Sequence, residues 1–487
     1  MIAAYCWPQS ALPGETISLC CHTNATKFQL EVIRQGKTDQ QVMSQRKLKG
    51  CKQRFDEQTS QVGCDWSPSL DIIIAPEWPS GFYLIRLEDS EGQTADAFFV
   101  VRAPEPRELV FVLSTSTWHA YNTWGGQSYY TGGTFVSPKR PLQPGFLQKA
   151  EPHRHRIARF KGWEKSDARA FVAEGHDDWC MAAGWANWEL LFARWLEANG
   201  YEPAYATSQD MDEHPDLLLG SAAYLSVGHD EYWSAGMRDT VENFIEDGGN
   251  AAFFSGNTSF WQVRFSDNYT QMIGYKCNLQ DDPVYDPASA PTLSTMWSDP
   301  LVGRPENRMT GVSFTRGGYA HMPNSPAGTG GYTIHQPDHW AFAGTGLEAG
   351  EQLGHRDIVV GYECDGCEFI VAVGKPTPTF TDGTPSSFEI LGTAPARLWE
   401  TAQAPDNLHD GYIGELNWVA ERIGGEDSPA IRHQFENGNA VMGTFRKGRG
   451  EVFTTGCTDW AYGLQDSCVS RVTDNVLKRF TGGSRIS

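Results

Sequence analysis

The sequence contains no apolar run that approaches the about 20 residues needed to span a bilayer. Its first eight residues also lack the basic segment and following apolar segment of a secretory signal. We therefore expect a cytoplasmic protein that has no membrane partner.

Positive charge is also scarce. The chain has 39 Lys and Arg against 60 Asp and Glu, which gives a formal net charge of −21. Such a charge repels phosphate backbones and anionic membrane surfaces, and it argues against a nucleic-acid partner. A small neutral or cationic substrate fits this charge better.

Cysteine is present in an odd number, eleven, without a secretory context. Reduced thiols are therefore predicted. Cys364 and Cys367 have the spacing of a zinc knuckle, but the Asp-Gly between them also favours a two-residue hairpin turn. Because no second close pair of ligands accompanies them, we expect the hairpin.

Familiar nucleophile and phosphate motifs are missing. No Gly-x-Ser-x-Gly elbow follows the apolar run that ends at Val227, and no glycine-rich phosphate loop follows the run at 109–113. Cys180 and Cys457 remain candidate nucleophiles of an amidotransferase-like enzyme. Buried structural cysteine is the commoner role, however, so nucleophilic catalysis is disfavoured.

Several domains are expected, because 487 residues exceed what one hydrophobic core usually serves. Residues 1–104 alternate short β-prone runs with turns, as a β-sandwich does, and Pro104 and Pro106 mark its end. Residues 105–275 and 431–487 are predicted to form an α/β domain. Residues 276–430 lose helical periodicity and are predicted to form a β-rich insertion.

The segment 224–234 is the most informative, because an apolar run ends abruptly in His229, Asp230 and Glu231. Ser234 then offers a helix cap, and the apolar run 251–255 completes a strand–helix–strand unit in a mainly parallel sheet. Residues 256–258 are expected to open a further helix. Polar residues just past such strands commonly carry function.

A second candidate segment is the aromatic, glycine-rich stretch 114–133, which we expect to be a loop. Positions two apart share a side of an extended chain, so His119 and Tyr121 should face one pocket, as should His229 and Glu231. These four residues are potential metal ligands. The plainer alternative is an ordinary hydrogen-bonded histidine and a half-buried tyrosine.

Tryptophan is abundant, with 17 residues. Trp185, Trp188, Phe192 and Trp195 recur on one helical face, which predicts a core helix more readily than a sugar-stacking surface. The predicted sandwich and these tryptophans still leave a second function open. The chain could be a non-catalytic or carbohydrate-related binding protein.

Taken in order, several motifs resemble the N,N-dimethylformamidase large-subunit family. They are AYNTWGG at 120–126, GHDEYWS at 228–234, GN at 249–250, GNTSFWQ at 256–262, VGYE at 360–363 and GCTDW at 456–460. The resemblance covers residues 106–487. It implies a doubly wound α/β core of the flavodoxin type, similar to class I glutamine amidotransferases but without their catalytic cysteine.

The resemblance also implies a mononuclear ferric ion, held by two tyrosinates and one glutamate, that hydrolyses a small neutral amide. Tyr121 and Glu231 match two of the ligands, and His229, Lys276 and Glu363 match catalytic residues of the pocket. Hard oxygen ligands suit a hard Lewis-acidic cation, which can polarise a carbonyl and acidify bound water.

One departure concerns the second tyrosine. Many relatives have tyrosine after Arg-Pro, whereas this chain has Leu142 after Arg140 and Pro141. Four residues are candidate substitutes: Tyr129, Tyr130, His153 and His155. A histidine-containing site would favour zinc or ferrous iron. The small-subunit partner of the family is not assumed, and homo-oligomerisation remains open.

Overall fold

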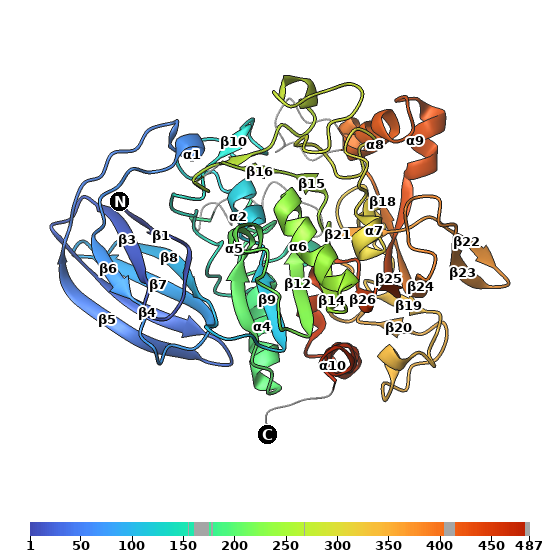
Figure 1. The fold of residues 1–487 in the computed structure, drawn as a ribbon, viewed down its shortest axis with the longest axis horizontal. Coiled ribbons are helices and arrows are strands. Elements are labelled where there is room, and N and C mark those ends of the chain that lie inside the picture. The colour runs from blue at the N-terminus through green and yellow to red at the C-terminus, as the bar shows by residue number, and fades with distance from the viewer. Residues whose placement is uncertain (154, 160–174, 177–178, 267, 404–413, 483–487) are drawn as a thin grey trace.

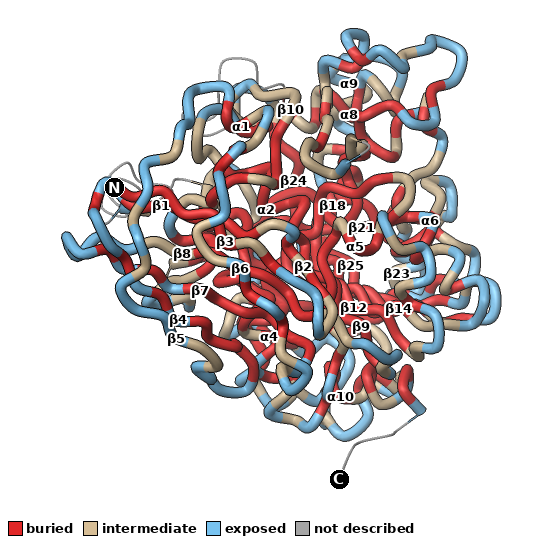
Figure 2. The backbone as a smooth tube through the Cα atoms, turned by 60° about the vertical axis from the view of Figure 1, so that its left-hand side comes forward, coloured by how far each residue is buried: buried red, intermediate tan, exposed pale blue. Residues whose placement is uncertain are grey.

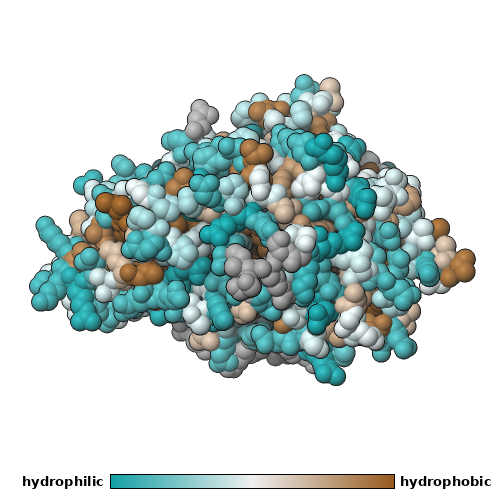
Figure 3. Space-filling view, turned by 60° about the horizontal axis from the view of Figure 1, so that its bottom comes forward, coloured by the Kyte–Doolittle hydropathy of each residue, from teal (hydrophilic) through white to brown (hydrophobic). Residues whose placement is uncertain are grey.

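A computed structural model describes residues 1–153, 155–159, 175–176, 179–266, 268–403 and 414–482. It is a mixed α/β structure in which the N-terminal sheets lie beside one large central sheet (Figure 1). Within these residues, no helix is both long and apolar enough to cross a bilayer. The face drawn in Figure 3 is mainly hydrophilic, with small scattered apolar patches.

Residues 2–101 form two facing sheets. One orders β1 (Ile2–Trp7), β3 (Thr16–Thr23) and β6 (Leu70–Ile73), and the other orders β2 (Ser10–Ala11), β8 (Thr94–Val101), β7 (Gly81–Asp89), β4 (Lys27–Gln35) and β5 (Asp39–Lys49). Both contribute buried side chains to one core that includes Leu19, Val32 and Ile85. Sequence reasoning missed β5, because this edge strand is mostly exposed and polar.

The central sheet begins with parallel strands in the order β11 (Ala204–Thr207), β9 (Leu109–Leu113), β12 (Ala223–His229), β14 (Asn250–Gly256) and β26 (Gly450–Thr454). Side chains alternate between its two faces. Figure 2 shows β9, β12 and β14 as buried strands. Phe111 and Leu225 pack on the side of α4 (Glu189–Ala198) and α10 (Ser467–Phe480). Val112 and Tyr224 pack on the side of α5 (Ser208–Glu213) and α6 (Ala235–Glu246).

The predicted strand, loop and helix around residue 230 are confirmed. Strand β12 ends at His229 and α6 starts at Ala235, where the Ser234 hydroxyl accepts the backbone N–H of Met237 at 3.1 Å. Strand β14 then pairs with β12 in parallel. The tryptophan face is also buried as expected, although α4 begins only at Glu189.

Beyond β26, the sheet continues with antiparallel β25 (Asn437–Lys447), which follows residues 276–430 in the sequence. Strands from residues 276–430 then complete the sheet: β24 (Glu389–Arg397), β18 (Ser313–Tyr319), β21 (Glu363–Gly366), β19 (Tyr332–Ile334) and β20 (Gln352–Leu353). The region also holds α7 (Asn307–Thr310), α8 (Glu415–Arg422) and the start of α9 (Pro429–Phe435), so its helical periodicity is not lost. The domain boundaries stay a prediction.

The predicted hairpin turn between Cys364 and Cys367 is wrong. Asp365 and Gly366 are buried in β21, which pairs with β18. Glycine is needed there for close strand packing and not for a turn, because a Cβ at Gly366 would lie 2.2 Å from the Asn439 carbonyl oxygen. The nearby hairpin instead joins β22 (Phe369–Ala372) and β23 (Lys375–Pro378). All eleven cysteines are free thiols.

Short elements complete the described fold. They are α1 (Thr59–Val62), α2 (Thr115–Tyr121), β10 (Phe135–Val136), β13 (Tyr232–Trp233), β15 (Trp261–Gln262), β16 (Arg264–Phe265), β17 (Met272–Ile273), and the 3-10 turns η1 (Ile157–Arg159), η2 (Leu279–Asp281), η3 (Trp340–Phe342), η4 (Thr401–Gln403) and η5 (Thr458–Gly463).

Gly228 lies one residue before the end of β12, at a position that favours glycine. Its φ of +78° is left-handed, and an added Cβ would lie 2.6 Å from Trp188 Cβ. We expect Gly228→Ala to lower the free energy of unfolding by about 2–4 kcal/mol through backbone strain and overpacking. Gly346→Ala is the control, because Gly346 has φ +72° and open space around it. Equal losses in urea denaturation would contradict the packing argument.

Candidate functional site

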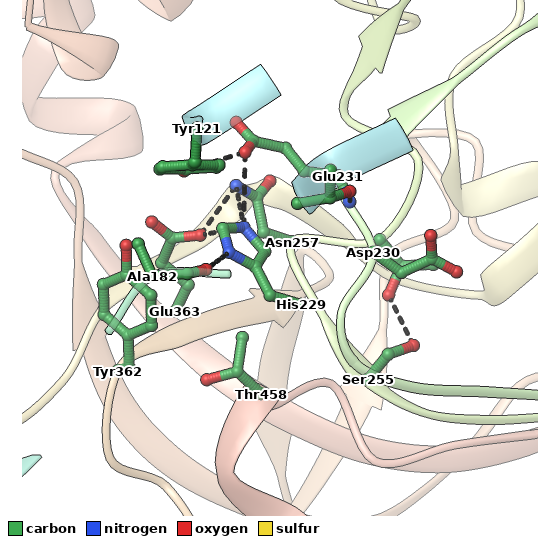
Figure 4. A network of polar contacts seen from close by, with 12 residues as sticks. Tyr121, Ala182, His229, Asp230, Glu231, Ser255, Asn257, Tyr362, Glu363 and Thr458 are labelled. Carbon is green, nitrogen blue, oxygen red and sulfur yellow. Dashed lines mark hydrogen bonds and ion pairs between the residues drawn. The ribbon is translucent and has the colours of Figure 1, made fainter. Parts of the chain in front are cut away.

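The carboxylate of Glu231 is the centre of a buried polar cluster (Figure 4). Tyr121 Oη donates to Glu231 Oε2 at 2.9 Å, and Tyr130 Oη lies 2.8 and 2.9 Å from the two carboxylate oxygens. The two tyrosine rings stack with centroids 4.1 Å apart. Two phenols therefore converge on one carboxylate.

Tyr121 reaches this cluster from a helix, and the loop predicted over 114–133 is wrong in that part. Helix α2 covers Thr115–Tyr121, and positions two apart on a helix are turned by about 200°. His119 therefore faces away from the cluster and contacts Gln9 at 2.8 Å. The spacing of Trp118 and Tyr121, three residues apart, was the available signal for a helix.

His229 and Glu231 do share one side of the chain, as predicted. His229 Nε2 lies 3.4 Å from Glu231 Oε2 and 2.6 Å from Glu363 Oε2. Its Nδ1 lies 2.7 Å from the Ala182 carbonyl oxygen, which only accepts, so Nδ1 carries a proton. Asp230 points away and accepts the Ser226 hydroxyl at 2.7 Å.

The charge of His229 follows from its two carboxylate neighbours. Burial opposes protonation of the imidazole, but Glu363 and then Glu231 raise its pKa to about 9. The raised pKa favours the imidazolium, which lies with Nε2 2.6 Å from the Glu363 carboxylate. An imidazolium can give a proton to a departing group, and a carboxylate beside it can accept one from water.

Asn257 is a member of the site that sequence reasoning missed. Its Nδ2 donates to Glu363 Oε2 at 2.8 Å and lies 3.3 Å from His229 Nε2. The helix predicted from residue 256 does not form, because Asn257 and Ser259 adopt left-handed φ values of 48° and 56° before β15 begins. Asparagine tolerates left-handed φ values better than most residues, and this was the sequence signal for a turn at Asn257.

Lys276 joins the cluster through two tyrosines. Its Nζ donates to Tyr232 Oη at 3.0 Å, and Tyr232 Oη donates to Tyr130 Oη at 2.9 Å. The ammonium also lies 4.0 Å from the centroid of the Tyr130 ring. Burial lowers the pKa of Lys276, and the Glu231 carboxylate opposes that shift. All five predicted site residues are thus joined in one network.

The residues that could replace the second tyrosine ligand differ in their neighbours. Tyr129 is buried with its hydroxyl unpaired within the protein, and its ring lies 5.4 Å from that of Tyr232. The rings of His153 and His155 contact those of Tyr462 and His176. Leu142 is half-buried and packs against the main core. Tyr130 is the candidate that contacts Glu231.

The cysteine alternative is not supported by the thiol environments. Cys180 and Cys457 are both buried, and burial raises the pKa of Cys457 to about 12. A thiol with such a pKa is a poor nucleophile near neutral pH, because the thiolate is the reactive form.

The donor set of the cluster suits a hard cation. Burial raises the pKa of Glu231 and raises those of Tyr121 and Tyr130 well above their usual range. A cation would compensate such buried oxygen anions. Among the described residues, no group of three or more His, Cys, Asp or Glu is arranged to hold a metal ion. A metal in this cluster would therefore depend on tyrosine oxygens.

Comparisons with known proteins agree with the family resemblance of the sequence motifs. The family model described as N,N-dimethylformamidase beta subunit-like, C-terminal, matches residues 29–474. The N,N-dimethylformamidase beta subunit of Paracoccus aminophilus is 22% identical over 458 residues, which cover 86% of this chain and 54% of that protein. The beta subunit of Alcaligenes sp. is 21% identical over the same coverage.

The chain thus spans about half the length of the curated relatives it matches. A solved structure of murine CEACAM1b covers 23% of this chain and 63% of its own at 12% identity, but its TM-score of 0.13 supports no inference. Since the family model spans most of the chain, the resemblance drawn from the motifs is confirmed. This chain belongs to the N,N-dimethylformamidase beta subunit-like family, in its C-terminal region.

Proposed function

We propose that this protein is a metal-dependent hydrolase that cleaves the C–N bond of a small-molecule amide. The observation that carries the proposal is the convergence of Tyr121 and Tyr130 on the buried Glu231 carboxylate. The names of the relatives, both N,N-dimethylformamidase beta subunits, support an amide as the substrate class. We also propose that the core shares the glutamine amidotransferase-like arrangement.

The three residues Tyr121, Tyr130 and Glu231 would hold one ferric ion. Three hard oxygen ligands with up to three negative charges match a trivalent hard cation, and Tyr130 supplies the ligand that Leu142 cannot. Bound there, the ion would polarise an amide carbonyl and make bound water acidic. A zinc site with histidine ligands is less well supported than a ferric site, because Glu231 is contacted mainly by the phenols of Tyr121 and Tyr130.

The remaining side chains supply proton transfer and positioning. Glu363 Oε2 lies 2.6 Å from His229 Nε2, so the Glu363 carboxylate would accept the proton of the attacking water while the imidazolium of His229 gives its Nε2 proton to the nitrogen of the departing amine. The proton held by Glu363 would then pass to His229 Nε2 and restore the pair. Lys276 fixes Tyr232 and, through it, the orientation of Tyr130.

The binding-protein alternative is less well supported. Trp185, Trp188 and Trp195 are each at most 7% exposed, so they cannot stack on a sugar. The relatives are named beta subunits, which supports the existence of a partner subunit in the family. We propose that this chain also binds a partner subunit. A homo-oligomer and a cytoplasmic location remain predictions.

The ligand role of Glu231 is tested by Glu231→Gln, which keeps the volume and removes the charge. We expect folded protein that has lost most of its iron, measured by elemental analysis after purification without added metal. Asp230→Asn is the matched control, because it makes the same change on the side turned away from the phenols. Equal iron in Glu231→Gln and wild type would contradict the assignment.

The role of Tyr130 is tested by Tyr130→Phe, with Tyr129→Phe as the control. Tyrosinate bound to ferric iron absorbs visible light, so loss of one ligand should weaken and shift the absorption band of the iron-loaded protein. Tyr129 is adjacent and buried, but its hydroxyl is not bonded to Glu231. An unchanged band in Tyr130→Phe, or the same change in Tyr129→Phe, would remove Tyr130 from the ligand set.

The proton-transfer role of Glu363 is tested by Glu363→Gln. We expect kcat for amide hydrolysis to fall by about 10²–10⁴-fold while the iron content stays constant, because general acid–base catalysis contributes that much. Loss of iron in step with activity would instead make Glu363 a structural support of the metal site.

A further inference from the structure

The segment that joins β5 to β6 lies against the loop that carries Tyr130. It contains helix α1, which lies beside β10 in Figure 1. The Ser60 N–H of this helix donates to the Gly125 carbonyl oxygen at 3.0 Å, and the Ser60 carbonyl oxygen accepts the Ser137 N–H at 2.8 Å. Two backbone hydrogen bonds therefore join Ser60 to both sides of the loop over residues 122–137.

Close packing adds to these hydrogen bonds. Gly126 has φ +137°, and a Cβ at this position would lie 2.4 Å from the Glu57 carbonyl oxygen and 2.6 Å from Ser60 Oγ. The nearby Trp124 ring lies 5.3 Å from the Phe55 ring between centroids. Because groups packed at such distances leave no free space, a shift of the α1 segment has to move the loop with it.

Tyr130 depends on this loop for its contact with Glu231. Its hydroxyl lies 2.8 and 2.9 Å from the two carboxylate oxygens, and hydrogen bonds between oxygens extend only to about 3.0 Å. Tyr130 follows Gly126 by four residues, and its N–H is held within the loop by Ser128 Oγ at 3.1 Å. A displacement of the loop by about 1 Å would break the contact, and misplacement of that size can lower catalytic rates by about 100-fold.

We propose that the α1 segment is a positioning element of the site, in which Ser60 sets the place of Tyr130 by holding the turn at Gly125 and Gly126. This rests on the proposed function, because Tyr130 is assigned there as a ligand. Ser60 contacts neither the substrate nor the proposed ion. Its role is to keep the phenol of Tyr130 on the Glu231 carboxylate, which gives the N-terminal sheets a part in the chemistry of the α/β core.

The inference is tested by Ser60→Val, because the larger side chain would enter the space between residue 60 and Gly126. In crystal structures of the full chain, we expect Tyr130 Oη to move from hydrogen-bond distance in the wild type to more than about 3.5 Å from both Glu231 oxygens in the variant. The kcat for amide hydrolysis should fall by about 10- to 100-fold. Ser60→Ala is the matched control, because it removes only an oxygen that has no hydrogen-bond partner among the described residues.

A second variant changes the same contact from the side of the loop. Gly126→Ala places a methyl group against the Glu57 carbonyl oxygen, so it should displace Tyr130 as Ser60→Val does. Gly132→Ala is its control. Gly132 also has a positive φ, of +98°, but a Cβ there would meet the flexible side chain of Gln127 at 3.2 Å and no part of the α1 segment.

Retention of the contact between Tyr130 and Glu231 in Ser60→Val or in Gly126→Ala would overturn the inference, and so would its loss in either control. A displaced Tyr130 with unchanged kcat would also overturn it. If one of the two variants does not fold, the other decides. The crystallographic distance needs no bound metal, so wild-type protein that carries no iron and hydrolyses no amide would refute the proposed function alone.

Discussion

A buried carboxylate needs compensation, and the arrangement of this site depends on how Glu231 obtains it. Isolated charges are rarely stable away from water, so they are paired, hydrogen-bonded or bound to metal. Here two phenols donate to the carboxylate, an imidazole lies 3.4 Å away, and a second carboxylate shares that imidazole. The proposed cation would complete this compensation and convert the phenols to ligands.

The fold brings these groups together because strands deliver them to one edge of the sheet. Tyr121 follows β9, Glu231 follows β12 and Asn257 follows β14, which is the usual position for ligands in open α/β sheets. Glu363 arrives on β21 and fits because Gly256 allows close contact. A Cβ at Gly256 would lie 2.5 Å from the Glu363 carbonyl oxygen.

Sequence reasoning identified the residues of the site better than their geometry. Side chains two positions apart share one side of an extended chain, and this rule correctly placed His229 beside Glu231 because the chain is extended there. The same rule failed at Tyr121, because α2 is helical, although the resemblance still selected that tyrosine. Tyr130 entered only as one of four substitutes, since its contact with Glu231 depends on how the 122–130 segment folds back. Asn257 was missed, because its role follows from a turn that the sequence did not distinguish from a helix start.

The central claim is that Tyr121, Tyr130 and Glu231 hold one iron ion, and anomalous X-ray diffraction at the iron edge tests it most directly. Crystals of protein purified without added metal should give one strong anomalous peak within bonding distance of the two phenol oxygens and the carboxylate. A peak bound to other residues would contradict the account. So would protein that hydrolyses amides and shows no peak at these three side chains.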